Sequence, residues 1–233
     1  MLTILNLKGG LTMSGEEIIF VTHNKGKAKS AEKYFKNLKF TTYDYKLYEP
    51  RSDSLKEIAT AKVKQAYEVV GKPCIALDAG FYIDELNGFP KAFVNFTLET
   101  IGIDGILKLM EGVENRKCSF KECLAYHDGN EIHYFYGEHP GVLTIKKQVV
   151  NVEEKWSDLW YVFVPEGYEK TLADMTQEER NIRTKDANSA MKNFANWYEV
   201  VKPFNVARHK GDDFKKDTVL NTNSSISDLQ RKC

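Results

Sequence analysis

Residues 17–27 read Glu-Ile-Ile-Phe-Val-Thr-His-Asn-Lys-Gly-Lys, an apolar run that stops at a short polar turn. The run is rich in β-branched side chains and predicts a buried strand over residues 17–22. After the turn, apolar side chains recur at helical spacing over residues 28–38. Asn24 has the chemistry of a helix N-cap, so this stretch predicts a strand–turn–helix unit.

The same alternation of strand and helix continues downstream. Residues 40–45 predict a second strand, and the capping box Ser54-Leu-Lys-Glu57 opens a helix that runs to about Val70. Residues 73–77 predict a third strand, and Asp78 follows directly at its end. The first part of the chain therefore predicts an α/β layer structure.

The second half of the chain changes its hydrophobic period. A helix is predicted over residues 101–112, and the period then becomes two. Strands are predicted over residues 117–126, 131–136 and 142–145. A second capping box, Thr176-Gln-Glu-Glu179, opens a last helix that runs to about Tyr198. Together the pattern predicts one mixed α/β domain.

The domain organisation follows from length and composition. The chain has 233 residues, which fits one domain with extensions better than two domains. A second methionine, Met13, precedes the first strand, so residues 1–15 are expected to be an extra N-terminal segment. Residues 16–202 form the predicted domain. From Pro203 the sequence is polar and loses periodicity, so residues 203–233 are expected to be a mobile tail.

Charge and composition exclude several functional classes. Lysine plus arginine and aspartate plus glutamate each number 33, so the formal net charge is zero and no partner of nucleic acid is expected. No apolar run approaches the roughly 20 residues of a membrane helix, and no signal peptide is recognisable. The four cysteines lack metal-ligand spacing. We therefore expect a cytoplasmic protein with reduced thiols, no zinc and no membrane partner.

Two places could carry chemistry. The turn before residues 28–38 offers free backbone N–H groups and the positive end of a helix dipole, and Lys27 can reach an anion there. Asp78 stands at the predicted end of a buried strand, where it could bind Mg²⁺ or take a proton from water. Each has a simpler explanation: a plain turn with solvated lysines, and an aspartate bonded to turn amides.

Taken together, these features resemble the inosine triphosphatase family, particularly its archaeal-type members, from Ile18 to Tyr198. The matching motifs are Thr22-x-Asn24-x-x-Lys27, Glu57-Ile-Ala-x-x-Lys62, Asp78-x-Gly80 with Leu86-Asn-Gly-Phe-Pro90, Gly102-x-x-Gly105, Phe135-x-Gly137-x-x-x-Gly141 and Pro165-x-Gly167-Tyr-x-Lys-Thr171. The order of the motifs along the chain also agrees with the family.

The resemblance implies a two-lobed α/β fold around a long curved mixed sheet, usually in a homodimer. It also implies attack of water on the α-phosphorus of a nucleoside triphosphate, with release of pyrophosphate and Mg²⁺ as cofactor. Asp78 is then the catalytic residue and, with Glu49, a metal ligand. The implied substrate-binding residues are Thr22, Asn24, Lys27, Lys62, Arg180 and Lys185.

The sequence departs from the family at the end that faces the base. Ser157-Asp-Leu-Trp-Tyr161 replaces the usual purine-recognition motif, and Arg183-Thr-Lys-Asp186 fills the place of a Ser-His-Arg motif. Leu77 and Ala79 replace an acidic residue and a hydroxyl residue beside Asp78. We therefore predict a pyrophosphatase for an altered or non-canonical base. A nucleotide-binding pseudoenzyme and a protein-interaction role for the tail remain alternatives.

Aromatic and histidine residues have simpler predicted roles. Trp160 and Tyr161 could stack on a base, whereas Trp197 is expected in the core. The histidines lack ligand spacing and are expected to be exposed or packing residues; these are His23, His127, His133, His139 and His209.

Overall fold

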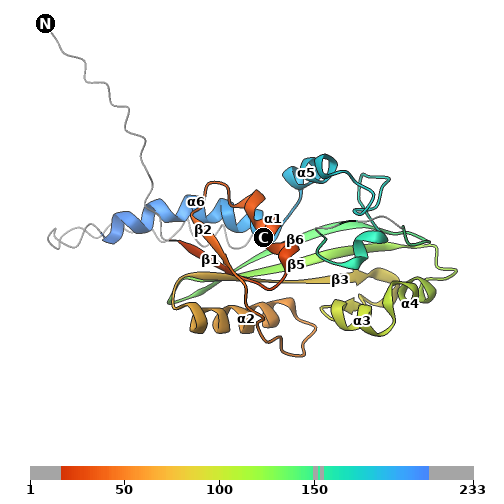
Figure 1. Ribbon diagram of the computed structural model, residues 1–233, viewed down its shortest axis with the longest axis horizontal. Helices are drawn as coiled ribbons and strands as arrows, with labels where there is room; N and C mark the ends of the chain where they lie inside the picture. The colour runs from red at the N-terminus through yellow and green to blue at the C-terminus, as the bar shows by residue number, and fades with distance from the viewer. Residues whose placement is uncertain (1–16, 149–151, 153–154, 210–233) are drawn as a thin grey trace, which may run out of the picture. The chain divides into compact units, whose positions relative to one another are not determined.

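The computed structural model describes residues 17–148, 152 and 155–209 (Figure 1). The N-terminal segment expected at residues 1–15 and residues 210–233 of the expected tail lie outside the described residues. Contacts divide the chain into one unit that ends at Glu199 and a second that begins at Val200. The sheet and the candidate site belong to the first unit.

One mixed sheet organises the first unit. Its strands are β1 (Ile18–Val21), β2 (Phe40–Tyr43), β3 (Cys74–Ile83), β4 (Pro90–Lys91), β5 (Lys117–His127), β6 (Ile132–Leu143) and β7 (Phe163–Pro165). The strand order is β2-β1-β3-β5-β6-β7, and β4 pairs with β3. β1 is parallel to β2 and β3, whereas the other pairs are antiparallel. The expected mixed sheet is confirmed.

Helices cover both faces of the sheet. They are α1 (Lys25–Tyr34), α2 (Leu55–Val70), α3 (Val94–Thr100), α4 (Gly102–Leu109), α5 (Gln177–Asp186) and α6 (Ala190–His209), with 3₁₀ turns η1 (Asp84–Leu86) and η2 (Asp158–Tyr161). α2 lies on one face, and α1 and the first part of α6 lie on the other (Figure 1). Among the described residues, no helix is long and apolar enough to cross a membrane.

The core is divided into clusters at the two ends of the sheet. At one end, Phe35 at the C-cap of α1 and Phe194 of α6 pack with Leu124 of β5, while α2 packs on the opposite face through Ala59 and Val63. A further cluster gathers the far half of β3 with α3, α4, η2 and β7. This arrangement agrees with the expected two lobes.

Both predicted capping sites lie at helix starts, but only the one at Thr176 forms a complete capping box, because the Glu57 carboxylate accepts from the Ser52 hydroxyl instead. The Ser54 side chain accepts a hydrogen bond from the Glu57 amide at the start of α2. Thr176 and Glu179 cap each other's backbone amides at the start of α5. Capping of this kind satisfies amides that have no partner within the helix.

Several predicted boundaries are wrong in instructive ways. The strand predicted to end before Asp78 continues to Ile83, because β5 pairs with β3 along its whole length. The last helix is broken at residues 187–189, where Ala187 is extended and Asn188 bridges to Glu138 of β6. The strands expected at 131–136 and 142–145 are one strand, β6. Residues 203–209, expected in the tail, end helix α6.

Candidate functional site

The turn between β1 and α1, which we call the anion turn, carries three of the predicted substrate-binding residues: Thr22, Asn24 and Lys27. The Asn24 side chain caps α1 by accepting a hydrogen bond from the Lys27 amide at 3.0 Å, and the Thr22 hydroxyl accepts from the Asn24 amide at 3.2 Å. The Lys27 ammonium donates to the carbonyl oxygen of Leu77 on β3 at 3.4 Å. Burial, with a contribution from Lys62, lowers the pKa of Lys27 to about 8. An anion bound here would raise the pKa of Lys27 again.

A second group of charges lies where β1 ends beside β3. The Lys62 ammonium of α2 donates to a Glu49 oxygen at 2.7 Å and to an Asp78 oxygen at 3.1 Å. Burial opposes the charge on Lys62, but the Asp78 and Glu49 carboxylates outweigh it and raise the pKa of Lys62. The pKa of Glu49 is lowered because Lys62 and Lys27 outweigh the effect of burial. The cluster is a preformed arrangement of opposite charges.

The two carboxylates could hold a magnesium ion whose other ligands would come from the phosphates of a substrate and from water. Oxygens of Glu49 and Asp78 both lie within 3.1 Å of the Lys62 nitrogen, so they already converge on one cation. Mg²⁺ in phosphate-handling sites often takes one or two carboxylates, with phosphate and water oxygens filling the other positions. Within the described residues, no group of three or more His, Cys, Asp or Glu side chains could hold a metal. The donor set fits a metal that arrives with phosphate.

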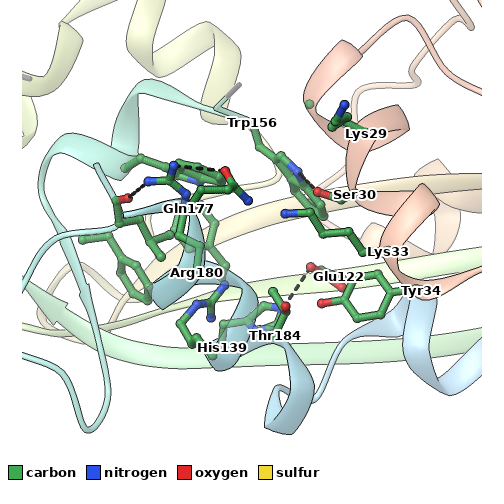
Figure 2. A pocket seen from close by; sticks show the side chains of 17 residues that line it. Lys29, Ser30, Lys33, Tyr34, Glu122, His139, Trp156, Gln177, Arg180 and Thr184 are labelled. Carbon is green, nitrogen blue, oxygen red and sulfur yellow. Dashed lines mark hydrogen bonds and ion pairs between the residues drawn. The ribbon is translucent and has the colours of Figure 1, made fainter. Parts of the chain in front are cut away.

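A pocket opens on the opposite face of β3 from Asp78. Asp78 pairs with Cys123 and faces α2, whereas Ala79 lines the pocket on the side of α1. Figure 2 shows α1 residues on one side of the pocket and α5 residues on the other, with Trp156 between them. Its polar lining includes Lys33, Tyr34, Glu122, His139, Gln177 and Thr184.

Glu122 and His139 form a buried pair on the pocket floor. Glu122 is only 4% exposed, and the His139 Nε2 lies 2.9 Å from its Oε1. The Ala190 amide donates to Oε2 at 2.9 Å, and the Ser189 hydroxyl donates to the same oxygen at 3.3 Å. Burial opposes ionisation of Glu122, but the His139 hydrogen bond and charge outweigh it and lower the pKa. Ser189 lies in the break between α5 and α6, and Ala190 is the first residue of α6, so the start of α6 supplies two of these donors.

Trp156 joins the turn to the pocket. Its indole Nε1 donates to the Ser30 hydroxyl of α1 at 2.8 Å (Figure 2). Its carbonyl accepts from the Asn24 side chain at 3.3 Å. The Lys27 ammonium lies 6.0 Å from the centre of its ring. Gly26 allows this approach, since a Cβ there would lie 2.8 Å from the Lys155 carbonyl oxygen. One ligand could therefore span both places.

Comparison with known proteins identifies the family. The model of the Ham1 family matches residues 18–197. The chain belongs to the Ham1 family. It is 37% identical over 185 residues to a dITP/XTP pyrophosphatase of Thermococcus kodakarensis, covering 77% of this chain and 96% of the relative. It is 33% identical over 188 residues to a dITP/XTP pyrophosphatase of Methanopyrus kandleri, covering 78% and 96%.

Solved structures agree on the fold of this Ham1 family member. The Ham1 protein of Staphylococcus aureus matches with a TM-score of 0.61 and 21% identity, over 83% of this chain and 100% of that one. A HAM1 protein of Coxiella burnetii matches with a TM-score of 0.65 and 18% identity, over 80% and 98%. At these identities the likeness establishes the fold.

The structure brings most of the predicted site residues together in this family member. Thr22, Asn24 and Lys27 share the turn. Arg180 lines the pocket, but its guanidinium donates to the carbonyls of Leu172 and Met175. Lys185 is exposed on α5 and is not among the pocket residues.

The sequence interpretation missed the pair of Glu122 and His139. A signal for Glu122 was present, because its side chain shares one face of β5 with apolar neighbours: Cys118, Phe120, Leu124 and Tyr126. His139 was expected to be exposed or packing, yet its side chain is only 11% exposed and bonded to Glu122. Glu122 lies opposite Ala79, on the face that also carries Leu77.

Proposed function

We propose that this protein is a nucleoside triphosphate pyrophosphatase that converts a nucleoside or deoxynucleoside triphosphate to the monophosphate and pyrophosphate. One observation carries the proposal: Trp156 links a helix-capped anion turn to an aromatic pocket, while Lys27 lies near both the pocket and the Asp78 cluster. A triphosphate and its base fit those two places. The names of the relatives from Thermococcus kodakarensis and Methanopyrus kandleri support this reaction.

In this proposal the phosphates bind at the anion turn. Thr22, Asn24 and Lys27 position them with the backbone amides of the α1 N-terminus, and the buried Lys62 ammonium neutralises charge. Arg180 contacts the substrate from the pocket wall. Lys185, on the same helix, stays a predicted contact.

Asp78 is the proposed base. Its carboxylate takes a proton from water, the water oxygen bonds to the α-phosphorus, and the bond to the bridging oxygen breaks, so that pyrophosphate leaves. Lys62 holds the carboxylate in place at 3.1 Å. When bound, Mg²⁺ held by Glu49 and Asp78 would neutralise charge on the phosphates.

The base-binding end supports an altered or non-canonical base as substrate. Of the segment Ser157–Tyr161, only Trp160 lines the pocket, whereas the Asp158 carboxylate is exposed and pairs with Lys155. Hydrogen bonds to the edge of the base would then come from polar side chains of β5, β6 and α5.

The testing experiment measures pyrophosphate release from a panel of triphosphates with Mg²⁺. The panel spans canonical, deaminated and modified bases, and it is run on the wild type, Asp78→Asn and the exposed helix control Asp104→Asn. Release that is lost only in Asp78→Asn supports the proposal. Release that persists in Asp78→Asn excludes Asp78 as the base.

A nucleotide-binding pseudoenzyme is the second candidate, favoured by one observation. Leu77, 2% exposed, packs into the core beside Asp78, so the side chain next to Asp78 adds no carboxylate. Binding of a non-hydrolysable triphosphate, together with no pyrophosphate release from any triphosphate in the panel, would establish this candidate. Absence of binding at millimolar ligand would leave a protein-interaction role.

Assembly and location belong to the same proposal. A homodimer is supported by the exposed rings of Phe89, Phe93 and Phe96 near α3, which offer an apolar surface to a second copy. Light scattering on the purified chain tests it, and a monomer at micromolar concentration would contradict it. The cytoplasmic location stays a prediction.

A further inference from the structure

Lys91 of β4 has a backbone conformation that a lysine rarely adopts. Its φ is +55°, in the left-handed region that glycine enters without steric cost. The conformation is held in place, since the Lys91 amide donates to the Gly88 carbonyl at 2.9 Å and Lys91 pairs with Phe81 of β3. Conformations of this kind cluster at functional sites, where the surrounding structure compensates for the strain. The Lys91 side chain should therefore make a contact that glycine could not make.

That contact is an ion pair with Asp53. The Lys91 ammonium donates to the Asp53 Oδ2 at 2.6 Å, and this hydrogen bond, with the charge of Lys91, lowers the pKa of Asp53. Both side chains are partly exposed, so the pair alone contributes little to overall stability. The pair does, however, join β4 to residues 44–54, a segment that contains no helix or strand and carries Glu49. Its role is therefore local: it ties this segment to the sheet.

Other contacts of the segment lead to α2. The Tyr48 amide donates to the Gln65 Oε1 at 3.0 Å, and the Tyr48 carbonyl accepts from the Gln65 Nε2 at 2.9 Å. The Ser52 hydroxyl donates to the Glu57 carboxylate at 2.7 Å. Asp53 adds a contact in a different direction, to β4. The segment is thus held from two sides, by a helix and by a strand.

The Lys91–Asp53 pair lies next to the Asp78 cluster. A Cβ on Gly80 would lie 2.6 Å from the Lys91 carbonyl oxygen, and Gly80 shares a face of β3 with Asp78. Tyr82 is the next residue on this face. Burial raises the pKa of Tyr82, and the carboxylates of Asp78 and Asp53 add to this effect. Asp53 and Asp78 therefore approach the same phenol.

We propose that Lys91 is a positioning residue, which through Asp53 holds the segment of Glu49 beside Asp78 so that both carboxylates are in place for Mg²⁺. This inference rests on the proposed function, in which these two carboxylates hold the metal. Ordering a segment at the moment of binding costs conformational entropy, and a segment fixed beforehand avoids that cost. Mg²⁺ demands near-ideal ligand geometry, so its affinity should be sensitive to this ordering. Lys91 acts on the metal only through the segment.

The test measures Mg²⁺ affinity by calorimetric titration into protein saturated with a non-hydrolysable triphosphate. Lys91→Met removes the ammonium. Lys121→Met is the matched control, because Lys121 lies opposite Gly80 on β5 and forms a similarly exposed ion pair, with Glu138 at 3.2 Å. We expect Mg²⁺ to bind about two- to fivefold more weakly to Lys91→Met, the scale of an exposed ion pair, and unchanged to Lys121→Met.

Steady-state kinetics give a second measurement of the same effect. In Lys91→Met the Mg²⁺ concentration for half-maximal pyrophosphate release should rise about two- to fivefold, while kcat at saturating Mg²⁺ stays at the wild-type value. A fall in kcat that saturating Mg²⁺ does not restore overturns the inference.

Lys91→Gly guards against a loss of folding. Glycine adopts a φ of +55° without steric cost, so this variant should unfold in urea no earlier than the wild type. It still lacks the ammonium, so Mg²⁺ should bind as weakly as to Lys91→Met. Wild-type Mg²⁺ affinity in Lys91→Gly overturns the inference.

Further variants separate positioning from a direct contact between Lys91 and the phosphates. If Lys91 acts through Asp53, Lys91→Met should have no additional effect in an Asp53→Ala background. Exchange of the two charges, by Lys91→Asp together with Asp53→Lys, should restore Mg²⁺ affinity, because aspartate tolerates the left-handed region. An effect of Lys91→Met that persists in Asp53→Ala, or an exchange that restores nothing, overturns the inference.

Failure of the proposed function would give a different result. Mg²⁺ binding that weakens as expected in Lys91→Met, with no pyrophosphate release from any triphosphate, overturns the pyrophosphatase proposal and supports the role of Lys91. Pyrophosphate release with equal Mg²⁺ affinity in the wild type and Lys91→Met overturns the role of Lys91 alone. A wild type that binds the triphosphate but no Mg²⁺ also overturns it.

Discussion

The anion turn with its Asp78 cluster and the aromatic pocket satisfy their charges in opposite ways. In the cluster, Lys62 contacts both Glu49 and Asp78 within 3.1 Å, so opposite charges meet before any ligand arrives. In the pocket, the Glu122 carboxylate accepts hydrogen bonds from three donors, whereas the buried Arg183 Nε has no acceptor among the described residues. The charges of the cluster pair with one another, whereas the Arg183 Nε in the pocket has no acceptor among the described residues.

This difference matches the two parts of a nucleotide. Every nucleoside triphosphate carries the same phosphates, so groups that handle them can be fixed in advance. Bases differ only in the donors and acceptors along their edges, so discrimination requires groups that only the right base satisfies. Substitutions in the cluster should therefore affect all substrates, and substitutions in the pocket should affect them selectively.

The largest effect is expected from Asp78→Asn. Loss of a general base lowers rates by about 10²–10⁴-fold, and the loss should be equal for every triphosphate because the cluster does not contact the base. Asn keeps the shape and an oxygen that can accept from Lys62, so folding should be retained. Steady-state pyrophosphate release measures the effect. A loss confined to some bases would break the division between cluster and pocket.

The cluster could be predicted from sequence because its members belong to compact local motifs. Asn24 and Lys27 are three residues apart, and the capping box at Ser54 places Lys62 on the buried face of α2. Asp78 was placed at the end of a strand, yet it lies inside β3. On β3, β1 pairs only with Cys74 and Ile75, so Asp78 lies beyond the point where these two strands pair.

The pocket could not be predicted because it depends on tertiary contacts between distant elements. Glu122 meets His139 through the β5–β6 register and meets Ala190 only because the last helix breaks at residues 187–189. The continuous helical pattern after Thr176 gave no sign of that break. Arg183 appeared only as part of a segment that had lost the family motif. Arg183 stands out only in the folded structure, where its buried Nε has no hydrogen-bond acceptor among the described residues.

Glu122→Ala should give the largest loss of stability. Removal of this buried, hydrogen-bonded carboxylate costs about 1–3 kcal/mol, because His139 and the Ala190 amide lose their acceptor. Urea unfolding measures the change, and Lys121→Ala on the same strand, whose ion pair with Glu138 is exposed, is the control. A loss below about 1 kcal/mol would show that the pair is not coupled to folding.

The same pair predicts a pH dependence whose sign is fixed. The pKa of Glu122 is lowered below its ordinary value of 4.5, so its ionised form adds stability above pH 4.5. This contribution is lost as the pH falls through the lowered pKa. The difference in unfolding free energy between wild type and Glu122→Gln should therefore shrink below pH 4.5. A difference that stays constant down to pH 3 would contradict the assignment.

A smaller effect is expected from the titration of Lys27. With a pKa of about 8, only about one-tenth of its side chains are charged at pH 9. If the charged form binds phosphate, affinity for inorganic triphosphate should fall about tenfold between pH 7 and pH 9. Lys27→Arg keeps its charge over this range and corrects for ionisation of the ligand. Parallel pH profiles for the two proteins would show that Lys27 does not bind the phosphates.

The smallest effect is expected from Trp156→Phe, at the junction of the two regions. Phenylalanine keeps a ring for stacking but loses the hydrogen bond to Ser30, a change worth about 1 kcal/mol. Because this bond ties the pocket wall to α1, we expect a loss of about fivefold in affinity for inorganic triphosphate and for a nucleoside monophosphate alike. Arg183→Met should weaken only the monophosphate, and Lys27→Met only the triphosphate. If Trp156→Phe weakened one ligand alone, Trp156 would belong to that region, and the two halves of the site would act independently.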